Sequence, residues 1–330
     1  MAGAGVVSTS AELRTCRVAA VQMASEDGAI EANLARAEPL CEEAAERGAQ
    51  LVVLPEFLPT GYVYAPEIWD AAEPADGPTV RWLIGQAKRL GVHLGTSFLE
   101  AEEEDFYNTF VLAAPDGEVA GRVRKQTPAA YEAFFTVGAP GPHVIDTAIG
   151  RVGVAICYEN VLAYTTRLMV RESADMLLMP HSAPCFSLRP LASSLLSQRY
   201  EEILASLAQL HAERLGVPTV MANKCGPWAS PLPGLPMLGQ RSRFPGLSAI
   251  ADSDGRLLAQ AGDEQAVLVE EVTLDPARKA RRPPRSYGRW SIELPRWASV
   301  MHAIEVVGSV RYRLSRERRR RARAILARGR

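Results

Sequence analysis

Short apolar runs that alternate with longer amphipathic segments constrain the fold of this chain more than any other feature. Residues 17–23 and 51–54 are predicted to be buried strands, and residues 29–47 carry apolar side chains at helical spacing before Gly48. This alternation, with some antiparallel hairpins, predicts a layered α/β fold. Further strands are predicted at residues 92–98, 108–114, 118–124, 152–157, 176–179, 217–222, 246–251 and 267–272, and further helices at residues 79–90, 167–173 and 194–215.

The pattern stops after Asp275-Pro276, and Pro283-Pro284 marks a break before an arginine-rich end. We therefore expect a flexible N-terminus (residues 1–15), a folded domain (16–275) and a C-terminal extension (276–330). Four consecutive arginines at residues 318–321 have two interpretations. They form either a solvated, partly disordered tail or a contact surface for a partner subunit or polyanions.

The overall charge argues against two classes of partner. The chain has 37 basic and 38 acidic side chains and a formal net charge of −1, so it should attract neither nucleic acid nor an anionic membrane. Its five cysteines form no CxxC pair, which indicates neither a zinc site nor a disulfide framework. No signal peptide is evident, and no apolar run approaches the ~20 residues that span a bilayer. We expect a cytoplasmic protein whose thiols stay reduced.

Three reactive side chains stand at or just after the ends of predicted strands. Glu56 follows LVVLP, Lys125 follows EVAGRVR, and Cys157 ends VGVAI. Functional groups gather at such positions in α/β sheets. Each residue alone also has an ordinary structural explanation: Cys157 as a small buried hydrophobe, Lys125 as a solvated charge, and Glu56 as a polar residue at a strand edge. The combination is more informative than any one of them.

The motifs LVVLPEF, GRVRKQTPAAYE and GVAICYEN, in this order, resemble those of the nitrilase (carbon–nitrogen hydrolase) superfamily. Supporting matches are AAVQM, RESADMLLMPHS, VPTVMANKCG and PGLSAIADSDGRLL, so the resemblance covers residues 17 to 275. It implies a four-layer α-β-β-α sandwich in which residues 16–275 are the catalytic domain. It also implies a fourth polar residue, matched by Glu132, and a homodimer or higher homo-oligomer. The extension, whose apolar stretch at residues 297–310 needs cover, is a candidate for packing across that interface.

The resemblance implies thiol chemistry that requires no metal and no organic cofactor. A thiol near its reference pKa of ~8.5 is mostly protonated at neutral pH, and the ammonium of Lys125 would favour the thiolate. Glu56 can accept the thiol proton and return it to the leaving group. Lys125 and a backbone N–H next to Cys157, that of Tyr158, can stabilise the oxyanion. Glu132 would hold Lys125 charged and help to position substrate or water.

Four residues near these motifs are candidates for substrate binding. Tyr158 follows the cysteine, His181 stands at a strand end in PHSAP, and Tyr62 and Tyr131 lie close to the motifs in sequence. Histidines and aromatic residues at such positions also serve as structure, so both interpretations stay open. Cys185 lacks the strand-to-turn context of a nucleophile. Two further polar residues favour structural roles: Glu159, bonded to backbone, and Arg167, paired with a carboxylate.

Four functions are compatible with the sequence. The first is hydrolysis of a small amide or N-carbamoyl compound, and the second is hydrolysis of a nitrile. Tyr158 stands where true nitrilases commonly carry tryptophan, which favours amides. The third is a soluble acyltransferase; CYEN also resembles the nucleophile region of apolipoprotein N-acyltransferases, but the chain lacks their membrane spans. The fourth is a non-catalytic binding protein on the same fold.

Overall fold

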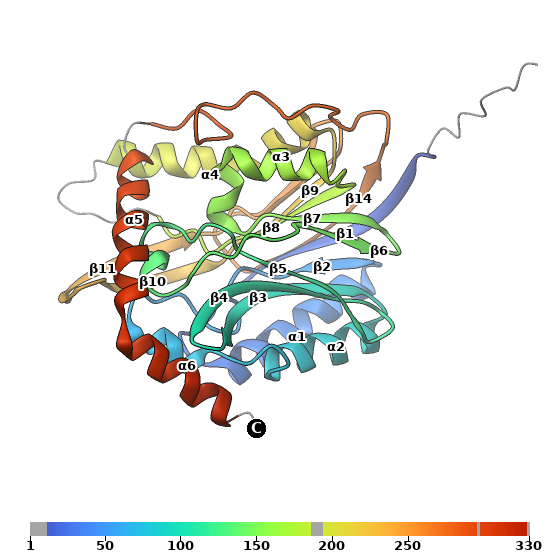
Figure 1. Ribbon diagram of the computed structural model, residues 1–330. Coiled ribbons are helices and arrows are strands. Elements are labelled where there is room, and N and C mark those ends of the chain that lie inside the picture. Colours follow the sequence, from blue (N-terminus) through green and yellow to red (C-terminus); the bar gives the residue numbers. More distant parts are fainter. Residues whose placement is uncertain (1–11, 186–193, 296–297, 329–330) are drawn as a thin grey trace, which may run out of the picture.

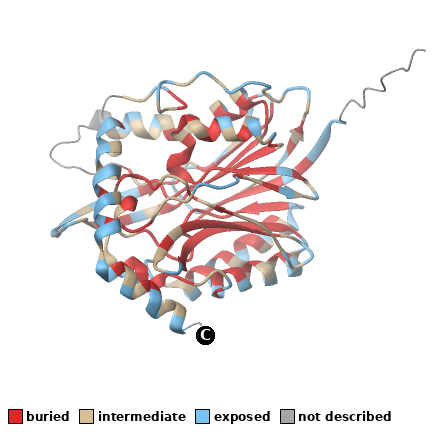
Figure 2. Ribbon diagram, in the orientation of Figure 1, coloured by how far each residue is buried: buried red, intermediate tan, exposed pale blue. Residues whose placement is uncertain are grey.

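The computed structural model describes residues 12–185, 194–295 and 298–328, without the side chains of residues 194–196, 235 and 236. Two six-stranded sheets face each other, and helices cover the outer face of each, giving a four-layer α-β-β-α sandwich (Figure 1). The fold class predicted from the sequence is therefore confirmed. Figure 2 shows the strands buried and the outward sides of the helices exposed.

The first sheet has the order β14-β1-β2-β3-β4-β5, and α1 and α2 pack on its outer face. The helix α2 begins at Pro78, whose fixed φ suits a first helical turn, and ends at Gly91, whose φ of +68° is left-handed. The elements of this half are β1 (Arg14–Gln22), α1 (Ile30–Glu46), β2 (Leu51–Val53), α2 (Pro78–Leu90), β3 (His93–Glu102), β4 (Asp105–Ala113), β5 (Val119–Arg124) and β14 (Ala266–Leu274).

The second sheet has the order β13-β12-β9-β8-β7-β6, with α3 and α4 on its outer face. Its elements are β6 (Val144–Thr147), β7 (Gly150–Val154), α3 (Ala163–Arg171), β8 (Met176–Pro180), α4 (Ser194–Leu215), β9 (Thr219–Ala222), β12 (Ala249–Ala251) and β13 (Leu257–Gln260).

Strand β1 shows how the sandwich buries both faces of a sheet. Val18 and Ala20 point into the core between the sheets, whereas Ala19 and Val21 point into the core beneath the helices. Because side chains alternate along a strand, a strand covered on both sides must be apolar at every position. The continuous apolar run at the start of the chain follows from this requirement.

A two-stranded hairpin and the position of Cys157 were not predicted. The hairpin consists of β10 (Cys225–Leu232) and β11 (Leu235–Pro245), and its several prolines obscure the strand pattern. The predicted strand at residues 152–157 is too long. Strand β7 ends at Val154, and Cys157 opens the 3₁₀ helix η3 (Cys157–Val161) with a φ of +50°.

The C-terminal extension forms two helices, α5 (Ala298–Leu314) and α6 (Arg316–Arg328), at one end of the sandwich (Figure 1). Tyr312 of α5 is buried, and its hydroxyl accepts the backbone N–H of Phe106 at 2.8 Å and donates to Asp105 at 3.1 Å. Arg318 also binds Asp105, and Arg321 binds Asp70 at 2.7 Å. The extension thus packs on its own domain, and packing across an oligomer interface stays a prediction.

Within the described ranges, no helix has both the length and the apolar character needed to cross a membrane.

We expect Tyr312→Phe to lower the free energy of unfolding by about 1–3 kcal/mol, because the buried N–H of Phe106 would lose its acceptor. Urea unfolding followed by fluorescence measures the change. Tyr287→Phe, at a tyrosine that is 40% exposed, is the matched control. Equal stability of the two variants would show that the hydroxyl of Tyr312 does not anchor α5.

Candidate active site

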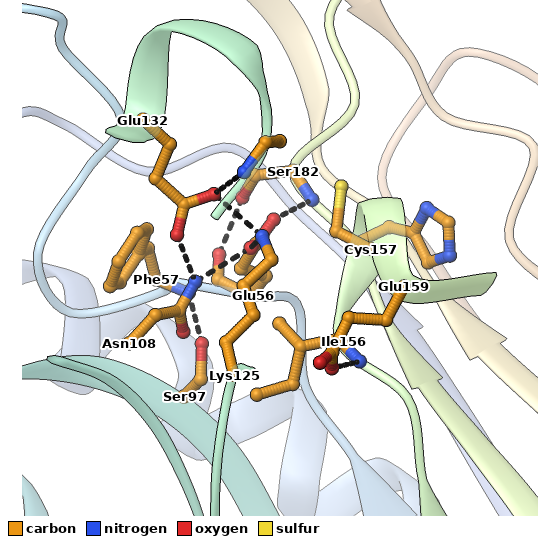
Figure 3. A network of polar contacts seen from close by, with 12 residues as sticks. Glu56, Phe57, Ser97, Asn108, Lys125, Glu132, Ile156, Cys157, Glu159 and Ser182 are labelled. Atoms are coloured by element: carbon orange, nitrogen blue, oxygen red, sulfur yellow. Dashed lines mark hydrogen bonds and ion pairs between the residues drawn. The ribbon is translucent and has the colours of Figure 1, made fainter. Parts of the chain in front are cut away.

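A buried ammonium lies between two buried carboxylates at one end of the sheets (Figure 3). Lys125, directly after β5, donates to Glu56 at 2.7 Å and to Glu132 at 2.6 Å. Glu56 follows β2, and Glu132 lies in the 3₁₀ helix η2 (Ala130–Phe134). Their side chains are at most 3% exposed. The structure therefore brings three of the four predicted catalytic side chains into direct contact.

Two residues that sequence reasoning missed hold this cluster. The amide of Asn108 donates to Glu56 at 2.8 Å and to Glu132 at 3.0 Å, which bridges the carboxylates. The backbone N–H of Ser182 donates to the other oxygen of Glu56 at 2.8 Å, and its hydroxyl donates to the Glu56 carbonyl at 2.5 Å. Asparagine is unfavourable within a strand. Its presence at position 108, inside a predicted strand, is the sequence signal that could have identified Asn108 as a functional residue.

Cys157 is the fourth member of the site. Its sulfur lies beside the backbone nitrogen of Ser182, next to the cluster (Figure 3), and Glu56, Lys125 and the Ser182 N–H are close enough to influence the pKa of the thiol. The side-chain amide of Asn160 donates to the carbonyl of Ala155 at 2.7 Å and to that of Cys157 at 3.0 Å. These bonds hold the backbone turn that carries the thiol.

Backbone strain is concentrated around the cluster. Three of the six described non-glycine residues with positive φ are Phe57 at +48°, Ala130 at +35° and Cys157 at +50°. Phe57 directly follows Glu56, Ala130 precedes Glu132 by two residues, and Cys157 carries the thiol. Such conformations cost on the order of 1–3 kcal/mol each and persist only where the surroundings impose them. Buried Lys224 is one such restraint, because its ammonium donates to the Phe57 carbonyl at 2.9 Å.

Charge within the cluster determines the protonation of Lys125. Burial alone would lower the pKa of Lys125, but the adjacent Glu132 and Glu56 outweigh it, and the net pKa is well above its usual value. Burial raises the pKa of Glu132, and Lys125 opposes that shift. Lys125 is therefore a permanent cation at neutral pH.

The thiol of Cys157 is protonated at rest. Burial, followed by the negative charge of Glu56, raises its pKa well above the usual value, although Lys125 acts in the opposite direction. The expected effect of Lys125 on the pKa of the thiol exists, but it is outweighed by burial and by the charge of Glu56. A base must therefore take the proton as the sulfur attacks.

A second buried network supports the residues around Lys125 and Cys157. Glu159 accepts the backbone N–H of Gln126 at 2.8 Å and that of Ile156 at 2.9 Å, as well as the hydroxyl of Tyr164 at 2.5 Å. The prediction that Glu159 bonds to backbone is confirmed. The prediction that Arg167 pairs with a carboxylate is wrong, because this exposed residue donates to the hydroxyl of Ser286 at 3.3 Å.

A cavity of about 300 Å³ opens beside the thiol. All four predicted substrate-binding residues contribute to its wall: Tyr62, Tyr131, Tyr158 and His181. The ring of His181 is neutral, because burial lowers its pKa to about 3. Cys185 also lines the cavity, but its thiol donates to Glu201 at 3.2 Å, away from the cluster. Over the described ranges, no group of three or more His, Cys, Asp or Glu side chains is arranged to hold a metal ion.

Comparison with known proteins establishes the family. The model of the family described as carbon-nitrogen hydrolase matches residues 17–282. The chain belongs to the carbon–nitrogen hydrolase family. This hydrolase is 31% identical over 279 residues to the N-carbamoylputrescine amidase of Solanum tuberosum, covering 81% of this chain and 89% of that one.

One further relative and one solved structure are also similar to this chain. A nitrilase of Pyrococcus abyssi is 32% identical over 276 residues, which cover 80% of this hydrolase and 92% of that nitrilase. A solved structure of a mutant amidase from Nesterenkonia sp. AN1 superposes with a TM-score of 0.61 at 23% identity, covering 83% and 95% of the two chains. In that amidase the acetamide moiety of fluoroacetamide is covalently attached to the active-site cysteine.

We expect Asn108→Ala to lower kcat/KM at least tenfold and to move the acid limb of the pH profile to higher pH. The reason is that the Asn108 hydrogen bond lowers the pKa of Glu132, so its removal raises that pKa and the carboxylate is protonated at a higher pH. The measurement is kcat/KM against pH. Asn33→Ala removes an equally buried, hydrogen-bonded amide on α1 and should leave the limb in place. An identical profile in both variants contradicts this account.

Proposed function

We propose that this carbon–nitrogen hydrolase cleaves the C–N bond of a small amide or N-carbamoyl compound through a thioester on Cys157. The observation that carries the proposal is the buried cluster in which a carboxylate and an ammonium are paired close enough to a thiol to influence its pKa. The homo-oligomer and the cytoplasmic location implied by the sequence stay predictions beside it.

In the first step, Glu56 takes the proton of the thiol while the sulfur attacks the carbonyl carbon. Negative charge then develops on the carbonyl oxygen. Lys125 has three N–H donors and spends two on Glu56 and Glu132, which leaves one for this oxygen. The backbone N–H of Tyr158 has no acceptor within the described part of the chain and supplies the second donor.

In the second step, the proton held by Glu56 passes to the leaving nitrogen, the C–N bond breaks, and ammonia or an amine departs. The acyl group stays on the sulfur as a thioester, or the carbamoyl group as a thiocarbamate. Glu56 then takes a proton from water as the water oxygen attacks the thioester carbon. Collapse of this intermediate releases the acid, and Glu56 returns the proton to the sulfur. Glu132 acts throughout by keeping Lys125 charged.

Hydrolysis of a nitrile is the second candidate, and the Pyrococcus abyssi relative is the observation that favours it. The same thiol would attack the nitrile carbon, and two waters would be consumed to reach acid and ammonia. Soluble acyl transfer and non-catalytic binding remain as outcomes of the tests below.

A panel of matched amides, N-carbamoyl compounds and nitriles, followed by ammonia release, tests the proposal. We expect turnover of amides or N-carbamoyl compounds, and none by Cys157→Ala with an unchanged circular dichroism spectrum. Unchanged activity of Cys157→Ala discards the mechanism. Nitrile turnover alone favours the second candidate, and product formed only with an added amine favours acyl transfer. No turnover of any panel member by the folded protein, with or without an added amine, favours binding.

Glu56→Gln should block the proton transfers in both halves of the reaction. The variant keeps a similar shape but lacks the group that shuttles protons, so the rate should fall about 10²–10⁴-fold. Product release by the purified variant from a substrate found in the panel measures the loss. Turnover within tenfold of the wild type would remove Glu56 from the proton transfers.

Lys125→Ala should lower kcat about 10²–10³-fold, the usual cost of losing one oxyanion donor. Lys88→Ala, at an exposed lysine of α2, is the control and should keep full activity. Thermal unfolding of each variant separates a chemical loss from a folding loss. A folded Lys125→Ala protein that loses less than tenfold would make Lys125 a bystander.

A further inference from the structure

Among the described residues, most side chains that line the cavity beside Cys157 are apolar or aromatic. None of the described lining side chains carries a charge, since His181 is neutral. Apart from backbone and the catalytic thiol, the polar groups are neutral: the side chains of His181, Ser182 and Gln240 and the hydroxyls of the lining tyrosines. The apolar part of the wall consists mainly of aliphatic side chains and aromatic rings, those of Tyr62, Tyr64, Tyr131, Tyr158, Ile203, Leu204, Leu207, Trp228, Leu294, Val300, Met301 and Ile304.

The charged groups just behind this wall are already paired with one another. Glu201, which accepts the thiol of Cys185, binds Arg243 at 2.8 Å. Arg289 binds Glu305 at 2.6 Å. A charged substrate group would lose its water on entering the cavity. None of these four side chains would be free to pair with it, because each is already paired. Burying an unpaired charge is strongly unfavourable.

Helix α5 supplies one side of the wall, through Val300, Met301 and Ile304. It lies beyond residues 17–282, the part of the chain matched by the family model. Gly308 fixes its position, because a Cβ there would lie 2.6 Å from the ring of Phe134 and 3.0 Å from the backbone of Ala133. Both neighbours belong to η2, the helix that carries Glu132. The apolar wall is therefore held at close range to the catalytic cluster.

The volume of the cavity indicates the size of the group that it receives. An apolar cavity of about 150 Å³ holds a benzene molecule. The cavity here, at about 300 Å³, exceeds what a minimal amide such as acetamide would fill. Water in such an apolar space has few partners, so an apolar group displaces it favourably.

We propose that the substrate carries an uncharged aryl or alkyl group of several carbons beside its scissile C–N bond, and that α5 selects for this group. The inference rests on the proposed function and names the substrate class for the same site. It predicts that compounds ending in an ammonium or a carboxylate are poor substrates of this hydrolase.

Four amides with the same reacting group test the inference: hexanamide, 4-phenylbutanamide, 6-aminohexanamide and the monoamide of hexanedioic acid. We expect kcat/KM for the first two to exceed that for the two charged amides about 100-fold, because a charge would be desolvated without a partner. Charged amides that are hydrolysed as fast as hexanamide would overturn the inference.

A charge placed on the wall should invert the preference. In Ile304→Glu the new carboxylate faces the cavity, and the ratio of kcat/KM for 6-aminohexanamide over hexanamide should rise at least tenfold. Val307→Glu adds the same charge to the same helix at a side chain that is 53% exposed and does not line the cavity, so its ratio should stay at the wild-type value. Each ratio comes from one preparation and is independent of the folded fraction. Equal ratios in the two variants would overturn the role of α5.

Binding to Cys157→Ala, measured by calorimetry, keeps the inference testable without turnover. Tighter binding of hexanamide and 4-phenylbutanamide than of the charged amides supports the apolar pocket even if wild-type protein hydrolyses none of them. In that case the proposed function is wrong, but the preference of the pocket for uncharged groups is still supported. Equal or tighter binding of the charged amides overturns the pocket, whatever the wild type hydrolyses.

Discussion

The ammonium of Lys125, enclosed between Glu56 and Glu132, is the interaction on which the rest of the structure depends. A buried cation without partners is costly, and removing one partner from such a group typically costs about 3–5 kcal/mol. The segments that follow β2 and β5 must therefore converge with η2 at one point. Glu56 also binds the second sheet, through His181 O at 3.2 Å and Ser182 N at 2.8 Å. The cluster thus joins the two sheets at the end where the chemistry is placed.

The strained backbone around the cluster follows from the same constraint. Side chains from different strands can converge on one point only if the chain turns sharply where each strand ends. Phe57 and Cys157 make such turns with left-handed φ values and without glycine. The Phe57 N–H donates to the hydroxyl oxygen of Ser97, and the side-chain amide of Asn160 donates to the Cys157 carbonyl; these two bonds restrain the turns. The reactive groups are therefore held in fixed positions at the ends of rigid strands.

The sequence predicted the parts of this structure that depend on local pattern. Buried strands and amphipathic helices were recognised because their periodicity is imposed by the layers. Glu56, Lys125 and Cys157 stood out because each stands at or just after the end of a predicted strand. Asn108 and Ser182 were missed because their roles depend on side chains distant in sequence. The β10–β11 hairpin was hidden by its prolines, and the C-terminal helices were missed because their arginines suggested solvent rather than Asp105 and Asp70.

The order of these parts along the chain has a consequence for synthesis. The cluster is drawn from residues 56–182, and the first sheet is complete once β14 pairs with β1. Helix α5 follows β14 in the chain and is therefore synthesised after it. A nascent chain can therefore assemble its reactive groups before the last side of the cavity exists, and loss of the final segment by proteolysis would widen the range of molecules admitted to a thiol that is already in place.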